Sequence, residues 1–476
     1  MIFSSYEFIA LFLPVVICIY YLLSKITTLK NQHIFLVFAS LFFYAYFNIN
    51  YLFIILVSIF VNYSIGTLIQ KSSVKQKRKF LFTFGIIFNI GLLGYFKYYD
   101  FFIDNLNVIF KSDFTLKYLL LPLGISFFTF QQFSFLLSIY KNTEKIDGII
   151  DYSLFVSFFP QLVAGPIVTY SEMIPQFKVY KKRYFNIENF TKAIYVFSLG
   201  LFKKIVIADT IAIFSNNGFA YEDNLGLLAA WATMLAYTLQ IYFDFSGYSD
   251  MAIGLGKMFN IELPINFNSP YKSHSIKEFW NRWHITLGRA LASYIYIPLG
   301  GNKKGKKRMY VNLLLTFLVS GLWHGAAWTF VFWGWLHGIG SVIERIFEKQ
   351  ISHISKYIQI FFTFLFVAFS WVLFRATSWA NALNIYKGLF NIKDLNLKQL
   401  GILAQDGIVN IPGPADIILI SGTIITCLWI VFRFPNVQQK EKHFEPSRLN
   451  AITITAIIIV SIIHLSRVSP FIYFNF

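Results

Sequence analysis

Charged residues and cysteines are scarce in this chain, and both shortages narrow the class of protein. Only 13% of its 476 residues are charged, whereas 56% are hydrophobic and 20% aromatic. So much apolar surface cannot be hidden in the core of a water-soluble globule, which excludes a soluble protein. The two cysteines, Cys18 and Cys427, both lie inside apolar runs. They are expected to be small core residues rather than a disulfide or a metal pair.

Long apolar runs recur from end to end and are typical of a polytopic membrane protein. These runs comprise residues 8–23, 34–47, 51–69, 80–96, 358–374, 417–432 and 451–463. Several approach the ~20 residues that a helix needs to cross a bilayer. We therefore expect an all-α integral membrane protein with about ten or eleven spanning or half-spanning helices. The first run lacks a preceding positive segment and a following cleavage site, so it is expected to remain as the first helix.

The surplus of basic residues, 41 against 23 acidic ones, is explained mostly by the positive-inside rule. The surplus therefore does not indicate a nucleic-acid partner. Binding of a specific anionic ligand is the alternative explanation for it. The cluster Lys71–Lys79 is expected in the cytoplasm, which places the N-terminus outside. Asn216–Leu225 carries no Lys or Arg and suits an external loop. Continued alternation places Lys440–Arg448 inside and the C-terminus outside, in a multi-pass protein of the cytoplasmic (inner) membrane.

No soluble domain, linker or internal repeat is evident, so a single membrane unit is expected over residues 1–476. Its core is expected at about 118–345, with peripheral helices at 1–115 and 357–476.

Two kinds of irregular segment interrupt this core. Leu121–Phe135 and Phe158–Val168 contain Pro and Gly at membrane depth, where backbone groups need surrounding protein or a water-filled cavity. A buried pocket or tunnel is therefore expected between these broken helices. Lys257–Arg308 holds ten Lys or Arg against two Glu. Within it, Ile276–Gly301 mixes aromatic and basic residues at helical spacing, which predicts a helix at the membrane interface.

The histidines His284, His324 and His337 are the candidates for chemistry. If residues 306–345 form a membrane hairpin with both ends in the cytoplasm, His324 lies sixteen residues after Arg308, or roughly 24 Å along a helix and deep in the bilayer. Its small neighbours, Gly325 among them, either allow close helix packing or leave room for a thin substrate. A buried neutral imidazole can accept a hydroxyl proton during acyl transfer. The alternative is a structural histidine bonded to a backbone carbonyl.

Other chemistries lack support in the sequence. No HxxxH or carboxylate cluster accompanies the histidines, so no metal site is expected. A GxSxG elbow, a Walker A loop and a dinucleotide fingerprint are also missing from usable positions, so serine hydrolase, phosphoryl-transfer and hydride-transfer chemistry have no support in the sequence.

Motifs in order along nearly the full length resemble the membrane-bound O-acyltransferases. They read PLGISFFTFQ, FFPQLVAGPI, GLFKKIVIAD, QIYFDFSGYSDMAIGLGKMF, FWNRWHITL, YIPLGGN, GLWHGAAWTFVFWGWLHG and FIYFNF. The chain most resembles the bacterial branch that includes the alginate and peptidoglycan O-acetylation proteins and the D-alanyl transfer protein of teichoic acid synthesis.

The resemblance implies a fold and a site. The fold is a ring of tilted helices around a thin waist, with a central tunnel where two funnels meet. The histidine of the WHG motif, His324, is implied as the essential catalytic residue, and His284 of FWNRWH as its polar companion. The C-terminal motif implies that Tyr473 carries the acyl group. The residues expected to line the tunnel or contact substrate are Trp323, Trp328, Trp283, Asn281 and His337.

The resemblance also implies the reaction. Acetyl-CoA is the expected cytoplasmic donor, with no resident cofactor and no metal. A secreted SGNH-type O-acetyltransferase partner would place the acetyl group on a cell-envelope glycan, peptidoglycan being favoured, and membrane lipid is a further partner. Alginate-like or other exopolysaccharide is the alternative acceptor. A non-catalytic acyl transporter and a structural scaffold are the alternative classes.

Overall fold

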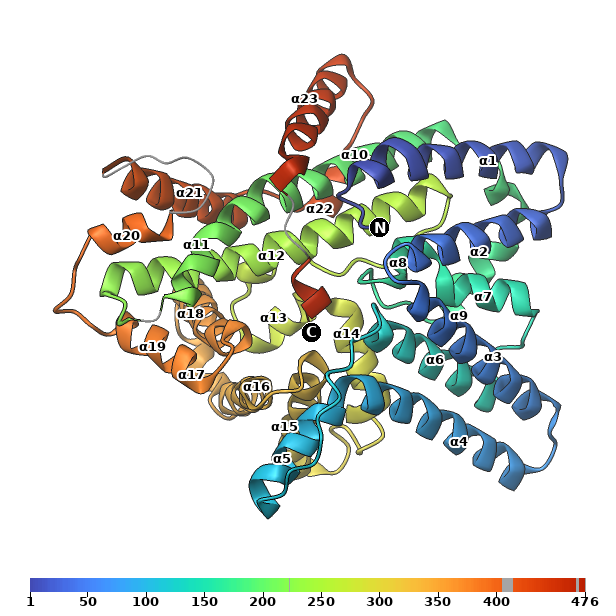
Figure 1. Ribbon diagram of the computed structural model, residues 1–476, viewed down its shortest axis with the longest axis horizontal. Helices are drawn as coiled ribbons and strands as arrows, with labels where there is room; N and C mark the ends of the chain where they lie inside the picture. Colours follow the sequence, from blue (N-terminus) through green and yellow to red (C-terminus); the bar gives the residue numbers. More distant parts are fainter. Residues whose placement is uncertain (222, 405–413, 468–470, 476) are drawn as a thin grey trace. The chain divides into compact units, whose positions relative to one another are not determined.

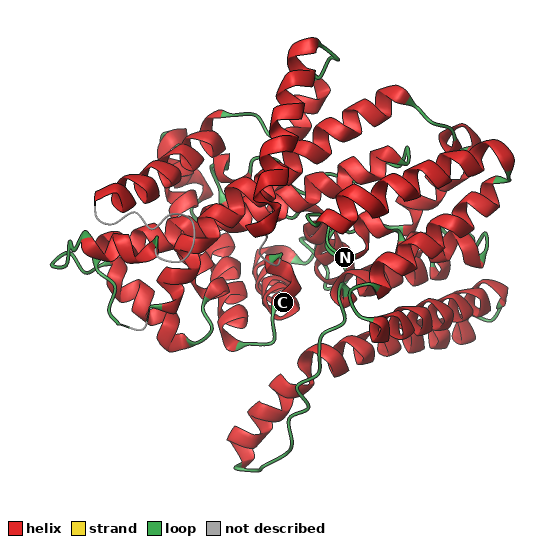
Figure 2. Cartoon of the chain, turned by 45° about the horizontal axis from the view of Figure 1, so that its top comes forward, coloured by secondary structure: helices red, strands yellow, loops and turns green. Residues whose placement is uncertain are grey.

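The protein is a helical membrane protein, described here from a computed structural model (Figure 1). The structure describes all residues except 222, 405–413, 468–470 and 476. Across these described residues every regular element is a helix, as Figure 2 shows, and no strand occurs. The all-α class expected from composition is confirmed.

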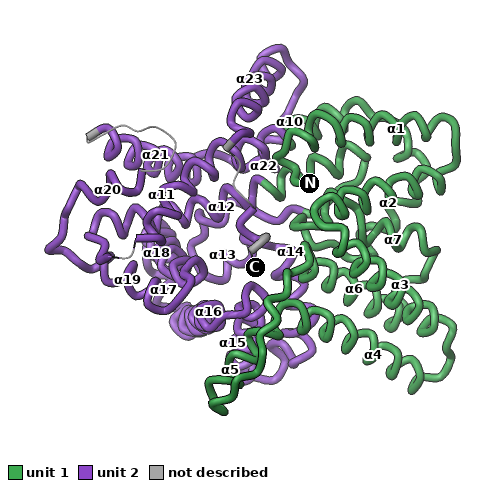
Figure 3. The backbone as a smooth tube through the Cα atoms, viewed as in Figure 1, with its two compact units in different colours: residues 1–197, 248–264 green, residues 198–247, 265–476 purple. Residues whose placement is uncertain are grey.

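The chain folds into two compact units, coloured separately in Figure 3. Unit 1 comprises residues 1–197 and 248–264, and unit 2 comprises residues 198–247 and 265–476. Helices α10 (Ile187–Phe202) and α12 (Leu227–Met258) each contribute residues to both units. The division into a core and peripheral helices stays a prediction, as do the ring and the central tunnel.

Unit 1 is built from nine helices besides its parts of α10 and α12, among the residues described. They are α1 (Leu13–Ile26), α2 (Leu29–Ala45), α3 (Ile49–Lys71), α4 (Lys75–Leu93), α5 (Tyr99–Phe110), α6 (Ile125–Tyr140), α7 (Ile149–Ser157), α8 (Phe159–Leu162) and α9 (Tyr170–Lys178). The helix breaks expected from Pro and Gly are confirmed. An irregular segment precedes α6, and α7 ends immediately before the short α8, whose first turn carries Pro160.

Gly124 shows why the break before α6 needs glycine. Its φ of +71° lies in the left-handed region, which side chains with a Cβ disfavour. A Cβ there would also meet the backbone carbonyl of Leu162 at 2.7 Å. The two interrupted segments of unit 1 are therefore packed directly on each other.

Unit 2 contains the remaining helices. They are α11 (Asp209–Ala220), α13 (Ile276–Arg282), α14 (Ile285–Leu291), α15 (Gly305–His324), α16 (Trp328–Ile346), α17 (Glu348–Ser352), α18 (Lys356–Arg375), α19 (Trp379–Leu389), α20 (Lys398–Leu403), α21 (Pro414–Arg433), α22 (Val437–Lys442) and α23 (Arg448–His464). Single turns of other helix types complete the unit, notably η4 (Lys203–Ala208), η6 (Ala292–Tyr296) and η8 (Ile472–Asn475).

Five of the described helical spans are long and apolar enough to cross a membrane. They are Glu7–Ile26, Ile49–Lys71, Lys75–Phe110, Lys356–Arg375 and Ala415–Arg433. Two shorter apolar helices, α6 and α23, fall below that length. The other helices are shorter or more polar, because the segments between the long spans carry the breaks and basic residues seen in the sequence. The expected total of about ten or eleven spanning or half-spanning helices stays a prediction.

Candidate active site

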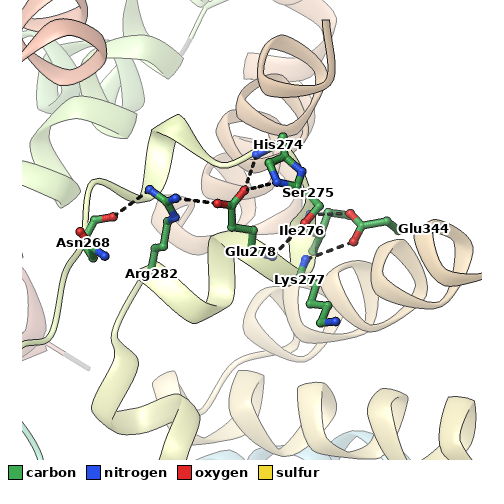
Figure 4. Close-up of polar contacts among 8 residues, drawn as sticks. All are labelled: Asn268, His274, Ser275, Ile276, Lys277, Glu278, Arg282 and Glu344. Carbon is green, nitrogen blue, oxygen red and sulfur yellow. Dashed lines mark hydrogen bonds and ion pairs between the residues drawn. The ribbon is translucent and has the colours of Figure 1, made fainter. Parts of the chain in front are cut away.

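Helix α13 is fixed at its N-terminus by carboxylates, as Figure 4 shows. Glu344 of α16 accepts the backbone N–H groups of Ile276 and Lys277. Glu278 accepts the N–H of His274 at 2.8 Å and forms an ion pair with Arg282 at 2.6 Å. Carboxylates satisfy the free N–H groups of a helix start and interact favourably with its dipole. These contacts tie α13 to α16, and the chain then leads directly to His284.

His284 occupies a strained turn between α13 and α14. Its backbone has φ 43° and ψ 52°, the left-handed conformation that is rare for residues other than glycine. Asn266 holds the following residues in place: its carbonyl accepts the Ile285 N–H at 3.0 Å, and its side-chain oxygen accepts the Thr286 hydroxyl at 3.0 Å. The continuous interfacial helix expected over Ile276–Gly301 is wrong at this point, because the Asn266 contacts redirect the chain.

His324 is the last residue of α15, which forms a helical hairpin with α16. The three residues 325–327 connect the two helices. A Cβ on Gly321 would overlap the Phe330 carbonyl, and a Cβ on Gly334 would overlap the Phe317 carbonyl. Gly321 therefore allows close packing of α15 on α16, which is one of the two roles that the sequence left open for the small residues around His324. Close packing fixes the end of α15 and with it the buried imidazole of His324.

The rings of His284, His324 and Tyr473 form a triangle in unit 2. Ring centroids lie 6.4 Å apart between the two histidines, 5.8 Å between His324 and Tyr473, and 6.2 Å between His284 and Tyr473. All three side chains are buried. Residues from three distant parts of the sequence are thus brought within reach of one another, as the predicted acyl-transfer site requires.

Aromatic side chains surround this triangle. Trp323 and Trp333 lie 5.0 Å and 5.2 Å from the His324 ring, and Phe374 lies 5.1 Å from it. Such apolar walls exclude bulk water from the His324 ring. A neutral ring can act as a general base.

A cavity of about 420 Å³ reaches His284. Its lining residues are Lys277, Trp280, Asn281, His284, Ile285, Leu287, Gly288, Arg289, Leu291, Ala292, Tyr296, Leu313, Thr316, Phe317, Ser320, Ser341 and Arg345. Lys277 and Arg289 are exposed whereas His284 is buried, so the cavity leads from a rim of exposed basic residues to the imidazole. Ser320, one helical turn before His324, also lines it. The volume falls within the range of small-molecule sites.

The other predicted site residues differ in whether they line the cavity. Asn281 is exposed and lines the cavity, and its contact with substrate stays a prediction. Trp283 is buried against Phe279 and Trp371 rather than on the cavity wall. Trp328 begins α16 with 56% of its side chain exposed and lies outside the cavity lining.

His337 is a buried structural support for the cavity wall. Trp280 donates its ring N–H to His337 Nδ1 at 3.3 Å, so the His337 proton lies on Nε2 and is donated to Ser370 at 2.8 Å. Trp280 itself lines the cavity. His337 thus acts on the cavity through Trp280, and the expected direct contact with substrate stays a prediction.

Sequence reasoning missed several residues that shape the site. Phe245 contacts Tyr473 at 4.2 Å and His284 at 4.7 Å between ring centroids. Both Phe245 and its neighbour Asp244 belong to the QIYFDFSGYSD motif, so the motif marked the position but not the contact. Asn266 carries no such signal, because a single Asn in a loop is ordinary. No group of three or more metal-ligating side chains occurs within the described part of the chain.

Fold and site together define a multi-pass helical membrane protein with two neighbouring buried histidines, one of which, His284, lines a cavity. The family model of the membrane-bound O-acyltransferases matches residues 2–379. The chain belongs to this family and is a membrane-bound acyltransferase.

Individual relatives agree with that assignment. The peptidoglycan O-acetyltransferase of Helicobacter pylori is 40% identical over 516 aligned positions, covering 100% of this chain and 98% of that protein. The probable alginate O-acetylase AlgI of Pseudomonas putida is 40% identical over 84% of this chain and 82% of its own length. The teichoic acid D-alanyltransferase of Bacillus subtilis is 28% identical over 53% of this chain and 68% of its own.

Proposed function

We propose that this protein takes an acetyl group from cytoplasmic acetyl-CoA and passes it through the membrane for O-acetylation of peptidoglycan. The observation that carries the proposal is the triangle of His284, His324 and Tyr473, with ring centroids 5.8 to 6.4 Å apart. It combines a base and a hydroxyl acceptor at a site that a cavity approaches.

The cavity supports an acyl-CoA donor. Lys277, Arg289 and Arg345 contribute cationic groups to its lining, and such groups suit the phosphates of CoA. The remaining lining is mostly apolar or aromatic, which suits an extended pantetheine arm. In this arrangement the thioester reaches His284 while the nucleotide stays at the basic rim.

The chemistry follows from the three side chains. His324 removes the phenolic proton of Tyr473, and the phenolate oxygen attacks the thioester carbonyl carbon. The carbon–sulfur bond breaks, and the CoA thiolate takes the proton from His324, which leaves acetyl-Tyr473 and CoA-SH. His284 assists by binding the developing oxyanion or orienting the thioester. A hydroxyl on an extracytoplasmic partner of the SGNH type then attacks the tyrosyl ester, releasing Tyr473 and carrying the acetyl group to the glycan.

Peptidoglycan is the favoured acceptor because the relative matched over the whole chain carries that activity in its name. An alginate-like exopolysaccharide is the second candidate, supported by 40% identity to AlgI over 84% of the chain.

The proposal is tested with His324→Ala and Tyr473→Phe. Both variants should keep the protein at its normal level in the membrane and lose envelope O-acetylation, because one lacks the base and the other the acceptor oxygen. The measurement is acetate released by mild alkali from purified peptidoglycan and, separately, from exopolysaccharide. A second measurement follows free CoA formed by the purified protein with acetyl-CoA and the secreted partner.

His353→Ala is the matched control, since His353 is exposed after α17 and should leave acetylation unchanged. Full acetylation by His324→Ala would end the base assignment. Normal acetylation by Tyr473→Phe would leave only direct transfer to the partner. Loss of acetate from exopolysaccharide alone would replace peptidoglycan with the second acceptor.

A further inference from the structure

A buried charge cluster lies behind the Tyr473 side of the site. It consists of Lys204, Asp209 and Asp244, from η4, α11 and α12. Lys204 Nζ lies 2.7 Å from Asp209 Oδ1 and 2.6 Å from Asp244 Oδ1. The three side chains are 3%, 4% and 1% exposed. Two carboxylates thus share one ammonium group, an arrangement whose desolvation is unfavourable and which stability alone does not require.

Asp244 has a second oxygen that contacts the end of the chain. Asp244 Oδ2 accepts the backbone N–H of Ile472 at 2.9 Å, joining residues 228 positions apart. Hydrogen bonds to an ionised carboxylate are stronger than those between neutral groups. Figure 1 shows the last helical turn, η8, beside α12, in agreement with this bond.

Phe245, which follows Asp244 in α12, contacts Tyr473, which follows Ile472 in the C-terminal segment. The Phe245 ring lies 4.2 Å from the Tyr473 ring and 4.7 Å from the His284 ring, centroid to centroid. Two consecutive residues of α12 therefore bind two consecutive residues of the tail, one through the backbone and one through the ring. The ring contact also reaches the catalytic histidine pair.

We propose that Asp244, held by Lys204, is the anchor that docks the C-terminal segment and places Tyr473 against the two histidines. Asp244 is a positioning residue: it contacts the backbone next to the acceptor tyrosine and not the acyl group. Lys204 holds the carboxylate turned so that one oxygen points to the ammonium and the other to Ile472. The role of the anchor rests on the proposed acyl-carrier function of Tyr473.

Asp244→Asn tests the anchor. The amide retains oxygen at only one of the two carboxylate positions, and the positive charge of Lys204 attracts that oxygen, so the Ile472 N–H loses its acceptor. The first readout uses Tyr473→Cys in a background with Cys18→Ser and Cys427→Ser. In detergent solution, the thiol introduced by Tyr473→Cys should react slowly with a maleimide when Asp244 is present. With Asp244→Asn the thiol should react roughly 10- to 100-fold faster, the factor expected for loss of a hydrogen bond to a charged group.

The second readout keeps Tyr473 and measures acetate transfer. Asp244→Asn should lower kcat by a similar factor while the KM for acetyl-CoA stays near the wild-type value, because the donor cavity lies on other residues. Phe245→Leu is a second variant that leaves the charge cluster intact. It should also accelerate maleimide labelling, because Phe245 also contacts Phe471 of the C-terminal segment, at 5.6 Å between ring centroids. Thr233→Val, a buried change in the same helix, is the control and should leave labelling slow.

Three results would overturn the anchor: folded Asp244→Asn protein that labels as slowly as the parent, Asp244→Asn protein with normal kcat although Tyr473→Phe is inactive, or equally fast labelling in Thr233→Val. Failure of the carrier function has a different signature. Tyr473→Phe would then remain active, while Asp244→Asn would still accelerate the labelling of the thiol introduced by Tyr473→Cys.

Discussion

At the scale of single residues, the site depends on side chains that hold its histidines rather than on the histidines alone. His284 adopts a left-handed backbone conformation that costs about 1–3 kcal/mol. Such a conformation persists only where the surrounding structure imposes it. Asn266 imposes it through the Ile285 N–H and through Thr286, whose N–H and hydroxyl both donate to Asn266 Oδ1. Strain that persists beside a buried imidazole is best explained by the need to aim that ring.

Asn266→Ala should therefore change the orientation of the His284 ring without removing the ring itself. Removing Oδ1 deletes the hydrogen bonds that the Thr286 N–H and hydroxyl donate to it, at a cost of about 1–3 kcal/mol in the free energy of unfolding. We expect acetate transfer to fall at least tenfold because small misplacements of catalytic groups are costly. Transfer rate and thermal unfolding of the purified variant measure the two effects. Asn266→Asp keeps an acceptor oxygen and should restore most of the activity; equal loss in both variants would contradict this account.

At the scale of elements, the sequence predicted the α15–α16 hairpin better than the α13–α14 turn. Apolar residues between basic ends at Arg308 and Arg345 were enough to indicate the hairpin with His324 near its tip. The aromatic and basic residues of Ile276–Gly301 keep helical spacing straight through His284, so the pattern gives no sign of a break. The break is set by a loop residue twenty positions before Thr286, a tertiary contact that local periodicity does not encode.

The hairpin makes its own prediction, since its glycines are contact points. Gly334→Ala adds a methyl group that overlaps the Phe317 carbonyl, and the two helices must separate to accept it. Overpacking of this kind costs about 1–3 kcal/mol and moves the end of α15 that carries His324. We expect transfer to fall at least tenfold with the KM for acetyl-CoA little changed, as measured on purified protein. Gly422→Ala in α21 is the control, because a Cβ there meets nothing within 4 Å. Matching losses in the two variants would rule out a specific role for the hairpin contact.

At the scale of the whole molecule, the candidate site lies within unit 2 and gathers residues from across the sequence. Asp244, Phe245, His284, His324 and Tyr473 all belong to it. The motifs marked four of these segments, yet their proximity follows only from the fold. The direction of acyl transfer depends on the sides of the membrane from which the donor and the acceptor reach the site. The proposed relay needs them on opposite sides.

The charge distribution gives that direction a test. The basic cluster Lys71–Lys79 favours the cytoplasm, whereas the segment around Asp223 carries no Lys or Arg and favours the outside. In a cysteine-free background, Asp223→Cys should react with a membrane-impermeant maleimide in intact cells. Ser73→Cys should react only after the membrane is permeabilised. Both positions are exposed, so a difference in labelling reports sidedness rather than burial. Labelling of Ser73→Cys in intact cells would reverse the topology and contradict the sidedness on which the proposed relay depends.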